Sequence, residues 1–194
     1  MRWVTNITTP VADILKAFFN ISDGDDAKES GKKVAGSVFR RVIYSVADYW
    51  LAFLSGVLII MLKAIGYGFL QMFFVMWAFD VVVAYAFVAV WQRTGKDVTL
   101  GEDYRRASDA IFQKSRIIGW MSRLGVVIKA TFWDGPEHIV IFFRKEIKTE
   151  ARMIVVLLIL TAMQAAIWTE IYSLGYDSIA GLIEHIMRAV RWYF

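Results

Sequence analysis

Three long apolar runs constrain this chain more than any other feature of its sequence. They cover residues 42–62, 69–92 and 153–174, and each is about as long as a helix that crosses the roughly 30 Å hydrocarbon layer of a bilayer. The composition agrees, because 58% of the 194 residues are hydrophobic, against roughly 45–50% in soluble domains. We therefore predict an all-α, polytopic integral membrane protein.

Polar and amphipathic segments separate these runs. Residues 117–133 are apolar but carry Arg123 and Lys129. Each cation at mid-bilayer costs roughly 2.5–3.5 kcal/mol, so we expect an amphipathic helix there and not a span. No helix breaker follows Pro136 until Gly175, which predicts that the third span continues a helix from about residue 136. The predicted segments are an amphipathic helix (about 10–21) and polar, basic linker within 1–41, a transmembrane hairpin (42–92), a basic cytoplasmic helical region (93–152), the third transmembrane helix (153–175) and a C-terminal amphipathic helix (176–194).

The basic residues predict the topology. Three Lys/Arg clusters, at 32–41, 93–96 and 144–152, flank the runs on what would be one side of the membrane. By the positive-inside rule that side is cytoplasmic, and the N-terminus lies there. The net charge of +4 suits contact with an anionic leaflet. We expect an integral protein of the bacterial inner (plasma) membrane.

The C-terminal segment leaves the number of spans open. Its apolar residues fall on one helical face, and its charged residues fall on the opposite face. This pattern favours an interfacial helix after three spans. A fourth span that returns the C-terminus to the cytoplasm is the alternative, with the polar face lining an oligomeric vestibule. The apolar face consists of Ile179, Leu182, Ile183, Ile186 and Val190.

The segment between the first two runs, KAIGYGFL (63–70), contains the tripeptide GYG. It resembles the selectivity filter of potassium channels, in which backbone carbonyls of TVGYG loops bind the ion. Ala64 stands where that family has Thr, however, and Phe69 stands where it has Asp. No residues remain for a pore helix before the tripeptide. We therefore predict a glycine-flanked turn that closes a transmembrane hairpin.

Polar residues inside the apolar runs are the first candidate functional residues. Asp80 lies near the middle of the second run, Gln164 near the middle of the third, and Glu170 near the end of the third. An ionisable residue at this depth is expensive, and it usually faces a bundle interior or water. If the second and third spans are antiparallel neighbours, Gln164 lies at the depth of Asp80. Two interpretations follow. The three residues line a path for an ion or a proton, or they only form hydrogen bonds that hold the helices together.

The basic region supplies a second candidate site. Anionic lipid headgroups are the expected partner. A phosphate-bearing ligand such as a nucleotide or oligonucleotide, and a partner membrane protein, are the alternatives. The candidate residues are Arg105, Arg106, Lys114, Arg116 and Arg123.

The sequence offers no basis for catalysis. It has no cysteine, only two widely separated histidines, and none of the nucleophile, nucleotide or zinc-protease motifs. We expect no enzyme, no cofactor and no metal site. The predicted function is a homo-oligomeric channel or pore in the lipid bilayer, gated through the basic cytoplasmic helices. A non-catalytic structural or assembly subunit of a larger membrane complex is the alternative.

Overall fold

The structure is a computed structural model that describes residues 5–193, with side chains for residues 11–188. Every regular element in that range is a helix, which confirms the all-α prediction. The elements are α1 (Thr5–Phe19), α2 (Ala27–Ala64), α3 (Phe69–Thr94), α4 (Gly101–Lys114), α5 (Arg116–Lys129), the π-helical turn η1 (Ala130–Asp134), α6 (Pro136–Phe142) and α7 (Glu150–Tyr193).

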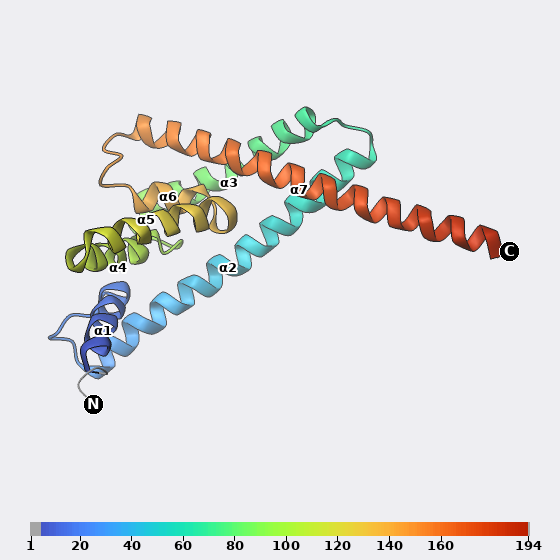
Figure 1. Cartoon of the computed structure of the whole chain (residues 1–194). Coiled ribbons are helices and arrows are strands. Elements are labelled where there is room, and N and C mark those ends of the chain that lie inside the picture. Colours follow the sequence, from blue (N-terminus) through green and yellow to red (C-terminus); the bar gives the residue numbers. More distant parts are fainter. Residues whose placement is uncertain (1–4, 194) are drawn as a thin grey trace.

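Three of these helices, α2, α3 and α7, are long and apolar enough to cross a membrane. They contain the three predicted runs. Helices α3 and α7 pack side by side, and α2 crosses them at an angle (Figure 1). The indole N–H of Trp77 on α3 donates to the Leu158 carbonyl (3.2 Å) and the Thr161 hydroxyl (3.1 Å) of α7. Ile59, Met76 and their neighbours close the core between the three helices.

A short turn joins α2 to α3, as predicted for the GYG segment. Gly66 has φ +95°, a conformation that glycine adopts without steric cost. Gly68 then precedes α3, and its backbone N–H donates to the side-chain oxygen of Gln71 at 2.7 Å. The tripeptide therefore closes a helical hairpin.

The polar linker predicted before residue 41 is wrong for most of its length. Helix α2 begins at Ala27 and runs through residue 41 without a break. The cause is an N-cap: the Asp26 carboxylate accepts the backbone N–H of Glu29 at 2.6 Å, which satisfies one of the free donors of the first turn. Hydropathy misses this part of the helix because its residues are mainly polar.

The single helix predicted from about residue 136 to 175 is also wrong. Helix α6 ends at Phe142, and α7 begins only at Glu150. Arg105 Nη1 donates a hydrogen bond to the Phe142 carbonyl (2.8 Å). The same guanidinium group also binds the Glu146 carboxylate (2.6 and 2.7 Å). The Thr149 hydroxyl accepts the Arg152 N–H (3.4 Å) and caps the new helix. A contact distant in sequence thus ends a helix that has no local breaker.

Helix α7 continues through Gly175 to Tyr193, so the predicted segment 176–194 is not a separate element. A single glycine costs a helix only about 1 kcal/mol. Lys63 of α2 binds α7 on both sides of this glycine, through the Ser173 carbonyl (3.0 Å) and the Asp177 carboxylate (2.5 Å). No turn interrupts residues 150–193, so α7 is one candidate span and no separate helix follows it within the described residues.

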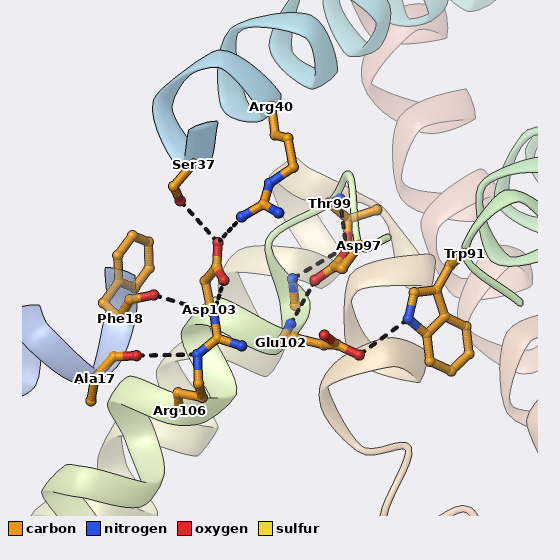
Figure 2. Close-up of polar contacts among 11 residues, drawn as sticks. Ala17, Phe18, Ser37, Arg40, Trp91, Asp97, Thr99, Glu102, Asp103 and Arg106 are labelled. Atoms are coloured by element: carbon orange, nitrogen blue, oxygen red, sulfur yellow. Dashed lines mark hydrogen bonds and ion pairs between the residues drawn. The ribbon is translucent and has the colours of Figure 1, made fainter. Parts of the chain in front are cut away.

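Helices α1, α4 and α5, here called the basic layer, pack against one end of the long helices (Figure 1). The amphipathic helix predicted over 117–133 is present as α5 and η1. Asp103 of α4, which is 4% exposed, joins the layer to α2. It accepts hydrogen bonds from the Ser37 hydroxyl (3.0 Å) and Arg40 (3.3 Å), and it pairs with Arg106, whose Nε reaches the Ala17 carbonyl of α1 at 3.1 Å (Figure 2).

Candidate functional site

A cavity of about 90 Å³ lies between α2, α3, α6 and α7. It has room for several water molecules. Four polar side chains from four different helices line it: Asp48 of α2, Asp80 of α3, Glu137 of α6 and Gln164 of α7. Most of the remaining wall is apolar or aromatic. Three carboxyl groups therefore share one small, largely apolar enclosure.

The cavity is elongated along the helices. Its lining on α3 extends from Met76 to Phe87, which corresponds to about 16 Å at 1.5 Å per residue. Its lining on α2 extends from Asp48 to Ser55. Small residues leave the space, because Ser55 and Ala84 are buried in the wall where larger side chains would fill it. The cavity therefore covers about half the thickness of a hydrocarbon layer.

Asp80 lies on the face of α3 that also presents Met76 and Ala84 to the core. Its Oδ2 atom is buried and has no hydrogen-bond partner among the described residues. A buried polar atom without a partner costs about 1–3 kcal/mol. A carboxyl group retained only to join helices would be expected to use both oxygens. No hydrogen bond joins either oxygen of Asp80 to another described residue, so this carboxyl group lines the cavity without a protein partner.

Glu137 enters the cavity because of Gly135. That glycine has φ +92°, and a Cβ atom built on it would lie 2.6 Å from both carboxyl oxygens of Glu137. Only glycine lets this side chain fold back over the start of α6. Tyr44 Oη of α2 lies 2.8 Å from Glu137 Oε1. Burial raises the pKa of Glu137 to about 8; the Tyr44 hydrogen bond opposes the rise, and the nearby carboxyls of Asp48 and Asp80 add to it.

Tyr44 and Asp134 lie between Glu137 and the basic layer. The Tyr44 hydroxyl also contacts the backbone carbonyl of Asp134, and the Asp134 carboxylate pairs with Arg41 (3.4 Å) and with Lys129. Tyr44 has one proton for two acceptors. When Glu137 is ionised, its carboxylate accepts a hydrogen bond from the Tyr44 hydroxyl. When Glu137 is neutral, its carboxyl group can donate a hydrogen bond to Tyr44, and Tyr44 then donates to the Asp134 carbonyl. The pair therefore has two hydrogen-bonded arrangements that differ in proton position.

His138 stands beside these residues. Its Nδ1 lies 3.0 Å from the Asp134 carbonyl, and because a carbonyl only accepts, Nδ1 carries the hydrogen. Nε2 is then an unprotonated acceptor, and it is buried with no partner among the described residues. Burial lowers the pKa of His138 to about 4, although the carboxylates of Asp134 and Asp97 favour its protonation. The imidazole is neutral at physiological pH.

The residues singled out from the sequence are only partly brought together. Asp80 and Gln164 line the same cavity, on helices that are neighbours. Glu170 is exposed and lies outside it. Sequence reasoning missed Glu137 and Tyr44 as site residues. The only local signal was the Gly135–Pro136 pair at the start of a short apolar segment.

The basic candidates do not form one open anion site. Arg105 binds Glu146 and Asp109, Arg106 binds Asp103, Lys114 binds Asp13 at 2.6 Å, and Arg123 binds Asp109 at 2.9 Å. Arg116 is exposed and has no ion pair among the described residues. Most of these cations therefore hold the basic layer together.

Within residues 5–193, no group of three or more histidine, aspartate or glutamate side chains is arranged to hold a metal ion. Comparisons with protein-family models, with curated proteins and with solved structures give no match to this chain. The geometry of the cavity therefore carries the functional argument.

Proposed function

We propose that this chain is an integral membrane protein that conducts protons through the cavity lined by Asp48, Asp80, Glu137 and Gln164. The observation that carries the proposal is the convergence of three carboxyl groups from three helices on one cavity of about 90 Å³, which lies between the candidate spanning helices and α6. Intramembrane carboxyl groups that face a polar cavity are typical of proton and ion pathways. It is the conducting function predicted from the sequence, with the proton as the ion.

Two features favour the proton over a larger ion. The cavity is small, and its three described carboxyl groups line it without being arranged closely enough to bind one metal ion together. A group that passes protons works best when its pKa lies near the working pH, and burial brings the pKa of Glu137 to about 8. Glu137 exchanges its proton with water in the cavity. Tyr44 reorients its hydroxyl between Glu137 and the Asp134 backbone carbonyl, which accepts a hydrogen bond but no proton.

The proposal includes an orientation. The three long helices cross the bilayer, and the basic layer faces the cytoplasm of a bacterial cell, in keeping with the positive-inside rule. Glu137 and Tyr44 form the cytoplasmic end of the path. Gln164, Ser55 and the Tyr172 side chain line the other end of the cavity. One chain supplies all four walls because α6 acts as the fourth, so conduction needs no second copy; the homo-oligomer stays a prediction.

The structural-subunit alternative is favoured by a different observation. The far part of α7 projects from the body of the molecule (Figure 1), and its apolar side chains Ile179, Leu182 and Ile183 are exposed. Exposed apolar patches on a helix are typical of surfaces that contact lipid or protein partners. In that alternative the polar cavity has no transport role.

Reconstitution into liposomes tests the proposal. The full-length protein is incorporated into vesicles with a pH-sensitive dye inside, and a potassium diffusion potential drives proton entry. We expect flux from the wild type and at least a tenfold loss in Asp80→Asn and Glu137→Gln, because the amide neither ionises nor releases a proton to the path.

Glu170→Gln is the matched control, since it removes a carboxyl from α7 outside the cavity. It should conduct like the wild type. Size-exclusion profiles in detergent must be unchanged in every variant. The proposal is wrong if wild-type vesicles show no flux, or if Asp80→Asn and Glu137→Gln conduct as well as Glu170→Gln. A wild type without flux that co-purifies with a stoichiometric partner would support the subunit alternative.

A further inference from the structure

The break between α6 and α7 forms an apolar groove that the proton path does not use. Its volume is about 520 Å³, and almost all of its surface is apolar. The end of α6, the connecting segment 143–149 and the first two turns of α7 build it. The apolar lining consists of Ile139, Phe143, Ile147, Ala151, Val155 and Val156.

A polar hollow of about 420 Å³ adjoins the groove, and Ile147 lines both. Two cations, Arg144 and Lys148, and one carboxylate, Glu150, line the hollow, together with Trp91. The guanidinium carbon of Arg144 lies 4.5 Å from the Trp91 ring centroid, a cation–π contact that holds the charge over the hollow. An apolar groove therefore opens beside a basic polar hollow, an arrangement that fits a molecule with a hydrocarbon chain and an anionic head.

The charges around the break differ from those in the basic layer. Lys145, Lys148 and Arg152 are exposed, and none of them pairs with a carboxylate among the described residues. The cations of the basic layer are mostly paired, as Arg105, Arg106, Lys114, Arg123 and Lys129 are. The break thus carries three exposed cations that no described carboxylate neutralises, beside an apolar groove. It complements an anionic ligand.

The position of the break also selects the ligand. Lys148 and Arg152 precede the apolar part of α7, and Val155 and Val156 belong to it. Arg152 and Val156 are four residues apart on α7, which corresponds to a rise of about 6 Å. The cations and the groove therefore lie on either side of the level where phospholipid chains would meet their headgroups. Cations at this boundary attract anionic phospholipids.

We propose that the break binds one anionic phospholipid, with an acyl chain in the groove between α6 and α7 and the phosphate at Lys148 and Arg152. The site is independent of proton conduction, because none of its residues lines the carboxyl cavity. Its occupant is a single lipid held by shape and charge, in addition to the general attraction of a basic surface for an anionic leaflet.

Lipid titration followed by native mass spectrometry tests this proposal. The full-length protein in detergent is titrated with phosphatidylglycerol or with phosphatidylcholine of the same chains. We expect one tightly bound phosphatidylglycerol, at least fivefold tighter than phosphatidylcholine. Lys148→Gln with Arg152→Gln should weaken phosphatidylglycerol binding about tenfold. Ala151→Trp, at an exposed position, fills the groove without changing charge and should weaken the binding of both lipids.

Lys32→Gln with Arg116→Gln is the matched control, because it removes two exposed cations elsewhere. It should change phosphatidylglycerol binding less than twofold. The proposal is overturned if this control weakens binding as much as the variant at the break, or if the two lipids bind equally. It is also overturned if glycerol phosphate displaces the lipid at equal concentration, since the groove would then contribute nothing. Lys148→Gln with Arg152→Gln should conduct protons normally in phosphatidylcholine vesicles, which separates this test from that of the proton path.

Discussion

Replacing Asp103 by alanine tests whether one buried carboxylate holds the basic layer on α2. Asp103 is 4% exposed and receives three partners: the Ser37 hydroxyl at 3.0 Å, Arg40 at 3.3 Å, and Arg106 (Figure 2). Arg106 in turn donates to carbonyls at the end of α1. The substitution therefore loosens α1, α2 and α4 from one another at a single point.

The magnitude follows from burial. Removing one partner of a buried ion pair costs about 3–5 kcal/mol, and a hydrogen bond to a charged group contributes about 1.5–3 kcal/mol. The side chains of Arg40 and Arg106 are 38% and 35% exposed, so water replaces part of what they lose. We expect Asp103→Ala to lower the free energy of unfolding by about 2–3 kcal/mol. Asp103→Asn keeps one acceptor oxygen and should lose about half as much.

The assay is urea unfolding of the full chain in a mild detergent, followed by tryptophan fluorescence. Urea is preferred because guanidinium salts screen the charges under test. Asp13→Ala is the matched control: it also breaks a link between α1 and α4, the 2.6 Å pair with Lys114, but both side chains are about half exposed. Its unfolding midpoint should not change. A loss below 1 kcal/mol in Asp103→Ala, or a loss equal to that of Asp13→Ala, would refute the reasoning.

Two further predictions concern the segment that carries Glu137. The raised pKa of Glu137 means that the folded state binds more protons than the unfolded state between about pH 4.5 and 8, so this group makes the protein less stable as pH rises through that window. In unfolding curves measured in detergent, Glu137→Gln should remove this pH dependence. The lowered pKa of His138 should remain effective in that variant and make stability fall as pH drops from 6.5 toward 4. Gly135→Ala places a Cβ atom within 2.6 Å of the Glu137 carboxyl group, on a residue with φ +92°. The substitution should lower the free energy of unfolding by about 1–3 kcal/mol and displace Glu137 from the cavity. Wild-type stability and wild-type proton flux in this variant would contradict the geometry.

Hydropathy was sufficient to find the three long helices, because apolar runs of about 20 residues match the length of a helix that can cross a bilayer. The prediction that Asp80 and Gln164 lie at one depth rests on the fixed rise per residue of neighbouring antiparallel helices, and both residues line one cavity between α3 and α7. The turn at Gly66 was predictable because a positive φ favours glycine.

The remainder depended on contacts between distant residues. Arg105 donates a hydrogen bond to the Phe142 carbonyl where α6 ends. The only local sign of the break is Thr149, which caps α7 but does not by itself end a helix. Glu137 was expected at the start of a helix below the membrane, but α6 packs against α3 and α7 and carries the side chain into the cavity. The pairs of Arg105 with Glu146, Lys114 with Asp13 and Arg123 with Asp109 depend on distant residues in the same way. The pairs of Arg105 with Asp109 and Arg106 with Asp103 are local, at i,i+4 and i,i+3 spacing.

The uninterrupted length of α7 has a mechanical consequence. Lys63 of α2 holds the helix as far as Asp177, and from there to Tyr193 the helix extends as one rod of about 24 Å at 1.5 Å per residue. A tilt of about 10° around Asp177 would move the far end by about 4 Å, by the geometry of a rigid rod of that length. The contact of Lys63 with α7 therefore sets the direction in which this end points away from the bundle.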